Sequence, residues 1–138
     1  KVDSLFKTCT HISIHCNLTE ETHHLVNESR MKMMPGRKGG IDCGNHIVNC
    51  ARGGIIDEQA LLAALEDGTI TSAALDVFEV EPLPEGYALI QHENFHGTPH
   101  IGAATMEAQQ RVGLDIADAV KIALSGKKPK TLVNGQYF

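Results

Sequence analysis

Short apolar runs alternate with amphipathic stretches along the chain. In His11–Cys16 apolar and polar residues alternate, which places Ile12 and Ile14 on one face. This pattern is typical of a β-strand with one buried side. Comparable short runs occur at His46–Ala51 and Ser72–Phe78. The pattern therefore predicts three strands, each followed by a connection long enough for a helical crossover.

The segments between and after these runs predict helices. Asp57–Asp67 has apolar residues at helical spacing, with Asp57 as a candidate N-cap and Gly68 as a candidate stop. Further helical patterns are a helix start at Thr19–Thr22, a short helix at Asn27–Met34 and a long helix from about Ala104 to Ser125.

Two stretches show no periodicity. Glu79–Pro99 contains three prolines and is predicted to be irregular, and Arg37–Asn45 is rich in glycine. Strands separated by helices indicate an α/β fold in which helices flank a parallel sheet.

Composition narrows the class of protein. A chain of 138 residues is long enough for one domain. The content of 42% hydrophobic and 21% charged residues argues against a disordered chain. The absence of Trp and the 4% aromatic content predict an aliphatic core. A net charge of −5 argues against nucleic-acid partners, and no apolar run is long enough to predict a membrane partner. Four cysteines without a CxxC pair, and no export signal, predict a reduced, cytoplasmic protein.

Candidate chemistry lies after the predicted strands, where parallel α/β sheets bind their ligands. Arg52 follows the second strand, Asp76 ends the third, and Glu81 and His100 lie in the loops beyond it. Arginine can bind a carboxylate through two hydrogen bonds, and histidine can transfer a proton near neutral pH. The alternative is an ordinary surface ion pair. No metal site is predicted, because Gly97 and Pro99 interrupt the histidines that are spaced by four.

Three motifs in sequence order resemble one enzyme family. They are NCARGGIIDE at residues 49–58, ALDVFEVEP at 74–82 and TPHIGAAT at 98–105, and the resemblance extends over about residues 5–134. The chain resembles the D-isomer-specific 2-hydroxyacid dehydrogenases, most closely the D-3-phosphoglycerate dehydrogenase branch. The resemblance implies a partial Rossmann-type NAD-binding domain. Its carboxyl-terminal half would occupy residues 1–126 with an insertion at about 37–45, and residues 127–138 would return toward the substrate domain.

The resemblance also assigns roles to residues. Arg52 would bind the substrate carboxylate and carbonyl, His100 would be the acid/base, and Glu81 would orient the His100 imidazole. Asp76 would contact the nicotinamide end of the NAD cofactor. The residues expected to line the cofactor are Cys16, Asn17, Cys50, Ala51, Arg52, Asp76, His100, Gly102 and Ala103.

The implied activity is NAD-dependent oxidation of a D-2-hydroxyacid, namely D-3-phosphoglycerate at the entry to serine synthesis. Three alternatives remain open: a glyoxylate or hydroxypyruvate reductase, an NAD-binding protein like the C-terminal-binding-protein corepressors, and a catalytically silent fragment or interaction module. The sequence has no GxGxxG turn, so the His11–Cys16 strand is expected at an open sheet edge. We therefore expect a homo-oligomer or a complementing chain.

Overall fold

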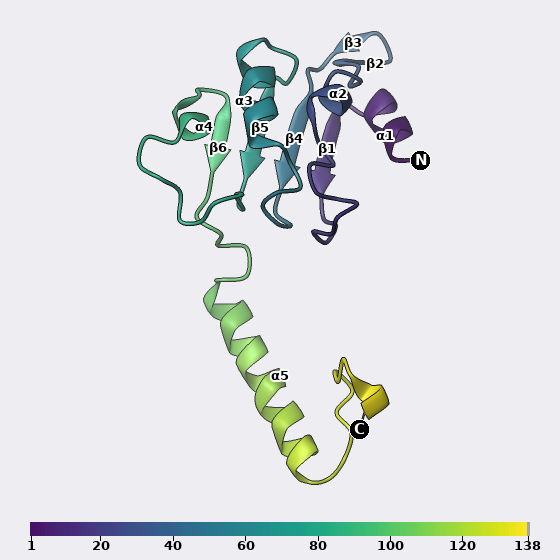
Figure 1. Ribbon diagram of the computed structural model, residues 1–138, viewed down its shortest axis with the longest axis vertical. Helices are drawn as coiled ribbons and strands as arrows, with labels where there is room; N and C mark the ends of the chain where they lie inside the picture. The colour runs from purple at the N-terminus through teal and green to yellow at the C-terminus, as the bar shows by residue number, and fades with distance from the viewer. Residues whose placement is uncertain (138) are drawn as a thin grey trace. The chain divides into compact units, whose positions relative to one another are not determined.

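The computed structural model describes residues 1–137, and four short parallel strands within residues 11–97 form its main sheet. The strands run in the order β1 (His11–Ile14), β4 (His46–Asn49), β5 (Ser72–Leu75) and β6 (Phe95–Gly97) (Figure 1). The α/β class and the three predicted strands are confirmed as β1, β4 and β5. As expected, β1 lies at an edge of the sheet.

The prediction of irregular structure over Glu79–Pro99 was wrong in part. This stretch contains the fourth strand, β6, and a one-turn helix, α4 (Ala88–Gln91). Both elements have four residues or fewer, so they offer too few positions for a hydrophobic period to show.

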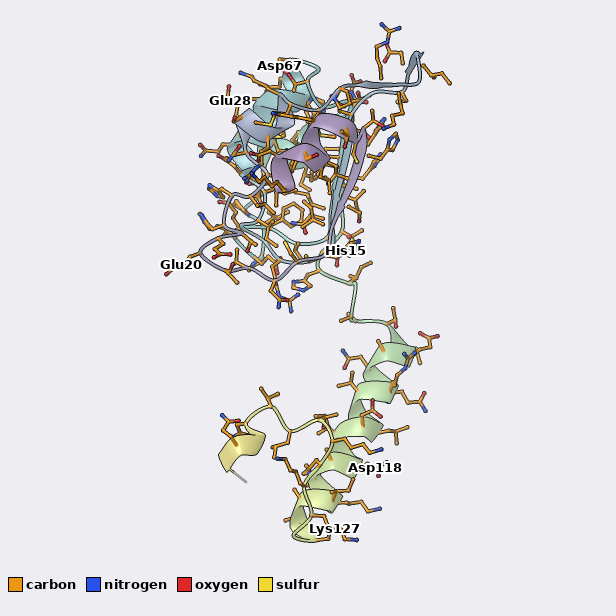
Figure 2. The ribbon with its side chains drawn as sticks, turned by 90° about the vertical axis from the view of Figure 1, so that its right-hand side faces the viewer. His15, Glu20, Glu28, Asp67, Asp118 and Lys127 are labelled. Atoms are coloured by element: carbon orange, nitrogen blue, oxygen red, sulfur yellow. The ribbon has the colours of Figure 1, made fainter. Side chains whose placement is uncertain are left out.

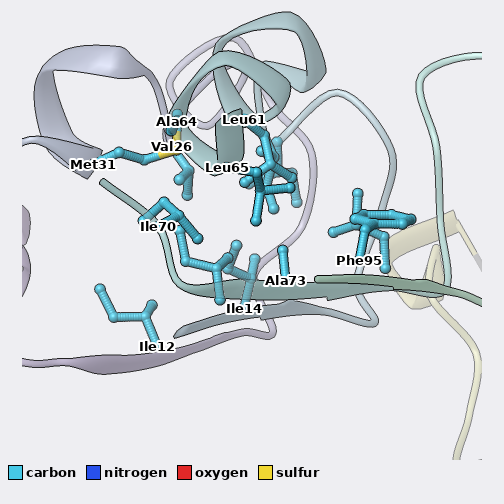
Figure 3. Close-up of a cluster of buried hydrophobic side chains, with 14 of the residues drawn as sticks. Ile12, Ile14, Val26, Met31, Leu61, Ala64, Leu65, Ile70, Ala73 and Phe95 are labelled. Carbon is cyan, nitrogen blue, oxygen red and sulfur yellow. The ribbon is translucent and has the colours of Figure 1, made fainter. Parts of the chain in front are cut away.

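The strand register explains which face of the sheet is buried. Ile12, Ile47, Ala73 and Phe95 are aligned across the four strands and all are buried. Helices α2 (Glu28–Met31) and α3 (Glu58–Glu66) contribute side chains to the buried cluster on this face. Met31 comes from α2, and Leu61 and Leu65 come from α3 (Figure 3). Apart from Phe6, Phe78 and Phe95, this buried cluster consists of aliphatic residues and methionines. This composition agrees with the expectation from the sequence.

Local side-chain contacts set the helix starts. The Asp57 carboxylate accepts the Ala60 N–H at 3.0 Å, which makes Asp57 the N-cap of α3 as predicted. The predicted helix start at Thr19–Thr22 was wrong, because these residues form a turn. Thr22 Oγ1 accepts the Thr19 N–H and donates to the Asn17 carbonyl, each at 2.7 Å, and this closes the turn locally. A first helix, α1 (Val2–Thr8), was not predicted.

The glycine-rich stretch after Pro35 forms a small exposed hairpin. Strands β2 (Arg37–Lys38) and β3 (Ile41–Asp42) pair antiparallel. Gly39 and Gly40 between them have φ angles of 57° and 84°, which glycine adopts without steric cost. That this stretch is an insertion stays a prediction.

The chain divides into two units, Lys1–His100 and a second unit from Ile101 onward. The second unit contains α5 (Met106–Leu124), which confirms the predicted long helix, and the 3₁₀ turn η1 (Gly135–Tyr137). Within α5 no residue is buried. None of the helices in residues 1–137 is long and apolar enough to cross a membrane. The predicted domain boundary after Gly126 lies inside the second unit and stays a prediction.

Candidate active site at the carboxyl edge of the sheet

The four parallel strands end at one edge of the sheet and deliver most of the predicted site residues there. β1 leads into Cys16 and Asn17, β4 into Cys50–Arg52, β5 into Asp76, and β6 into His100. Figure 2 shows His15 and Glu20 at this end of the first unit, whereas Glu28 and Asp67 lie at the opposite end. The parallel topology therefore gathers residues that are far apart in sequence.

His100 and Glu81 form a hydrogen-bonded pair at this edge. His100 Nδ1 lies 2.8 Å from Glu81 Oε2, and the other carboxylate oxygen accepts the Phe78 N–H at 2.9 Å. These two hydrogen bonds, the one from His100 above all, hold the pKa of the Glu81 carboxyl below its ordinary value. Because Nδ1 faces the ionised carboxylate, Nε2 is the ring nitrogen available to exchange a proton with a substrate.

A pocket of about 400 Å³ opens beside this pair. Besides Glu81 and His100, its lining is apolar and consists of Phe78, Pro82, Leu83 and Pro99. An acid/base pair at the wall of an apolar pocket is a common arrangement for binding a small molecule and transferring a proton.

The loop after β4 presents Arg52 and is fixed by a buried side chain. Asn49 is 1% exposed; its Oδ1 accepts the Ala51 N–H at 2.9 Å and its amide donates to the Arg52 carbonyl at 3.0 Å. The Arg52 guanidinium is exposed and donates to the Ala51 carbonyl at 2.6 Å. The buried Asn49 side chain thus holds the backbone of this loop, while Arg52 is exposed to solvent.

A smaller, more polar pocket lies between the ends of β1 and β4. Its volume is about 160 Å³, and its lining is His15, Cys16, Asn17, Cys50, Ala51 and Arg52. Five of these six residues are among those expected to line the cofactor, so the structure brings this part of the predicted site together.

Asp76 is held in place rather than presented freely. It is 6% exposed, and Thr98 Oγ1 donates to its carboxylate at 2.5 Å. The Asp76 N–H donates to the Asn49 carbonyl at 3.0 Å, and the Thr98 N–H donates to the Leu75 carbonyl at 3.0 Å. Asp76 thereby links the ends of β4, β5 and β6.

The structure does not place every predicted residue in one pocket. Arg52 lines the polar pocket, whereas Glu81 and His100 line the apolar one. Gly102 and Ala103 belong to the second unit, so their part in cofactor binding stays a prediction. Within residues 1–137 no group of three or more His, Cys, Asp or Glu residues could hold a metal ion.

Several residues of this region were not identified from the sequence. Asn49 and Thr98 lie inside the motifs, and Asn49 stands at an inward position of its strand, which is the one signal that a polar residue there has a partner. Glu58 and Glu79 have no such signal. They meet through a tertiary contact, in which Glu58 Oε1 accepts the Glu79 N–H at 2.7 Å.

Comparisons with known proteins identify the family. A family model described as the D-isomer specific 2-hydroxyacid dehydrogenase NAD-binding domain matches residues 1–102. The chain is 47% identical over 127 residues to D-3-phosphoglycerate dehydrogenase 3, chloroplastic, of Arabidopsis thaliana, covering 92% of this chain and 20% of that protein. It is 41% identical over 133 residues to the glyoxylate reductase of Thermofilum pendens, covering 96% of this chain and 37% of that protein.

Solved structures agree with these relatives. The crystal structure of a glyoxylate reductase from Paecilomyes thermophila matches with a TM-score of 0.83 and 33% identity, covering 98% of this chain and 39% of that one. A protein from Thermus thermophilus matches with a TM-score of 0.85 and 36% identity, over 96% of this chain and 40% of that one. The chain spans well under half the length of each of these proteins. The chain therefore belongs to the D-isomer specific 2-hydroxyacid dehydrogenases, and its residues 1–102 match their NAD-binding domain.

Proposed function

We propose that this chain supplies the proton-transfer pair and part of the cofactor site of an NAD-dependent oxidoreductase that acts on the CH–OH group of a D-2-hydroxyacid. The contact that supports this most directly is the 2.8 Å hydrogen bond between His100 Nδ1 and Glu81 Oε2. It fixes the imidazole so that Nε2 can take the proton of a substrate hydroxyl.

The other residues of the edge fit complementary tasks. Arg52 is exposed next to a polar pocket, where its guanidinium can bind a substrate carboxylate through two hydrogen bonds. Cys16, Asn17, Cys50 and Ala51 line a pocket at the carboxyl ends of two parallel strands, which is where dinucleotides bind in such sheets. These residues would hold part of an NAD cofactor, which would supply the acceptor for the hydride of the substrate carbon.

For the substrate we propose D-3-phosphoglycerate, which places the reaction at the entry to serine synthesis. The identity of 47% to a plant D-3-phosphoglycerate dehydrogenase supports this choice. A second candidate is glyoxylate or hydroxypyruvate, supported by 41% identity to a glyoxylate reductase and to a glyoxylate/hydroxypyruvate reductase B.

A chimera tests the activity and the substrate together. This chain would replace the matched segment of the Thermofilum pendens glyoxylate reductase, and NADH consumption or formation would be followed with each substrate. Because the host supplies the segments outside this chain, oxidation of D-3-phosphoglycerate by this chimera supports the first candidate. Reduction of glyoxylate or hydroxypyruvate supports the second only in a matching chimera in which this chain replaces its matched segment of the Arabidopsis thaliana D-3-phosphoglycerate dehydrogenase. A folded chimera that binds NADH without turning over any of these substrates would contradict the enzymatic proposal and favour a silent or corepressor-like role.

We further propose that the chain assembles as a homo-oligomer or with a complementing chain, in the cytoplasm. The position of β1 at a sheet edge and the exposed apolar side chains of α5 support assembly. All four cysteines are free thiols, which suits a reducing compartment. Light scattering on the purified chain tests the first point, and a monodisperse monomer would contradict it.

A further inference from the structure

Glu58 is a buried carboxylate at the start of α3. Its residue exposure is 5%, and it accepts two hydrogen bonds: Oε1 from the Glu79 N–H at 2.7 Å and Oε2 from the Tyr87 hydroxyl. Burial raises the pKa of Glu58 although both hydrogen bonds oppose this effect. A buried acid is costly unless its oxygens are satisfied, so these two partners define where the carboxylate lies.

The peptide group that joins Phe78 to Glu79 is held on both sides. Its N–H donates to Glu58. Its carbonyl lies against Gly53, where the Cβ of any other residue would come within 1.8 Å of the Phe78 oxygen. With the hydrogen bond on one side and the backbone contact on the other, this peptide has little freedom to rotate.

The orientation of this peptide bears directly on the acid/base pair. The N–H of Phe78, the residue that provides the carbonyl half of the peptide, donates to Glu81 Oε1 at 2.9 Å. The other oxygen of Glu81 accepts from His100. The Phe78 N–H belongs to the preceding peptide, but Glu81 lies only two residues beyond Glu79. Release of the Glu79 N–H from Glu58 would therefore let residues 79–81 shift relative to the Phe78 N–H and loosen one of the two contacts that hold the Glu81 carboxylate.

We propose that Glu58 is a positioning residue for the Glu81–His100 pair: it fixes the Phe78–Glu79 peptide, and Tyr87 orients the Glu58 carboxylate. Glu58 itself lines a pocket other than the one beside His100. The inference rests on the proposed function only for the catalytic meaning of the pair, because the contacts themselves are independent of substrate and cofactor.

Nuclear magnetic resonance on the 138-residue chain tests this inference without any turnover assay. Two signals report on the pair: the titration of the Glu81 carboxyl carbon and the ¹⁵N resonance of the His100 Nδ1–H group that donates to Glu81. Glu58→Leu removes both acceptor oxygens, whereas Glu58→Gln keeps an oxygen that can accept the Glu79 N–H. Glu66→Leu, an exposed change on the same helix, is the matched control.

If Glu58 positions the pair, Glu58→Leu raises the Glu81 pKa toward its ordinary value and removes the hydrogen-bonded Nδ1–H signal. Glu58→Gln and Glu66→Leu retain both. The Asp67 carboxyl serves as an internal reference for the Glu58 variants, because its pKa is lowered by local hydrogen bonds from Thr69 and should not change in any of them. A general loosening of the fold would alter Asp67 and Glu81 together, and would count against a positioning role.

A folded Glu58→Leu chain with an unchanged Glu81 titration and an unchanged His100 signal would overturn the proposal. If Glu58→Leu does not fold, Glu58→Asp decides instead, since the carboxylate shortened by one methylene no longer reaches the Glu79 N–H in the same geometry. Unchanged signals in that variant would equally overturn it. Failure of the chimera to turn over substrate, with these signals as expected, would reject the enzymatic proposal and leave the positioning contact established.

Discussion

Gly53 lies directly against the carbonyl group of Phe78. A Cβ atom at position 53 would fall 1.8 Å from the Phe78 oxygen and 2.2 Å from its carbonyl carbon. This approach brings the loop that presents Arg52 into backbone contact with the loop that contains Glu81. The candidate carboxylate-binding arginine and the candidate acid/base pair are therefore parts of one packed layer, although they line different pockets.

Gly53→Ala should lower the free energy of unfolding by about 1–3 kcal/mol, because a methyl group cannot be placed against a backbone carbonyl without moving one of the loops. Urea unfolding of the first unit measures this change. Gly113→Ala is the matched control: the new methyl group on α5 meets no atom within 4 Å, so unfolding of the first unit should be unaffected. Equal stability of Gly53→Ala and the parent would show that the loops are not in the contact described.

Asn49→Ala should also destabilise the chain, by about 1–3 kcal/mol, because it leaves the Ala51 N–H and the Arg52 carbonyl without their side-chain partners. Urea midpoints measure the loss, and hydrogen exchange at the Ala51 amide should accelerate. Gln59→Ala removes an exposed amide on α3 and should change stability little. An Ala51 amide that exchanges at the parent rate in Asn49→Ala would argue against the role given to Asn49.

Glu58 and Glu81 should contribute to the stability of the fold with opposite dependence on pH. The pKa of Glu81 is lowered from its ordinary 4.5, so its contribution to stability is present above that pH and is lost as the pH falls through the folded-state pKa. The pKa of Glu58 is raised from 4.5, so its contribution is present below that pH and is lost as the pH rises through the folded-state pKa.

Stability differences between each variant and the parent test these signs. As the pH rises from about 3 to about 7, Glu58→Gln should gain stability relative to the parent, mainly above pH 4.5, and Glu81→Gln should lose it, mainly below pH 4.5. The Glu81 effect should be the smaller, because its side chain is 36% exposed and solvent screens the pair. Curves of the same slope for both variants would contradict the assigned environments.

Deletion of the hairpin at residues 37–42 should be tolerated. Its strands are fully exposed, and the Cys43 N–H already donates to the Gly36 carbonyl at 3.0 Å across its base. Joining Gly36 to Cys43 should therefore change the free energy of unfolding by no more than about 0.5 kcal/mol, as for other surface changes. Asn45 must be kept, because its side chain accepts the Gly36 N–H and donates to the Thr69 carbonyl. A large loss of stability on deletion would show that the hairpin is an integral part of the fold.

The sequence predicted the parts of the fold in which periodicity extends over enough residues. β1 showed alternation, and β4 and β5 showed short apolar runs. α3 showed helical spacing with a recognisable cap, and α5 showed helical spacing over a long stretch. β6 could not be predicted this way, because only Phe95 of its three residues is buried. The turn at Thr19–Thr22 was predicted wrongly, since hydroxyl groups that cap a helix can equally close a single turn.

The candidate site also contains residues that the sequence could predict and residues that it could not. The strand-end rule placed Asn17, Arg52 and Asp76 at the carboxyl edge, because that rule depends on topology alone. The tertiary contacts that hold these residues in place could not be predicted from the sequence. Glu58 meets Glu79 and Tyr87 only after α3 packs beside the loop that follows β5, and such a contact between segments more than 20 residues apart has no local signature.

The most direct measurement is the separation of turnover from cofactor binding in the chimera described above. His100→Gln should lower kcat by about 10²–10⁴-fold, the usual contribution of a positioned acid/base, and should leave the Kd for NADH nearly unchanged. His96→Gln, an exposed histidine on β6, is the control and should alter neither constant. A His100→Gln chimera with the parental kcat, or one that loses turnover and NADH binding in parallel, would contradict the account.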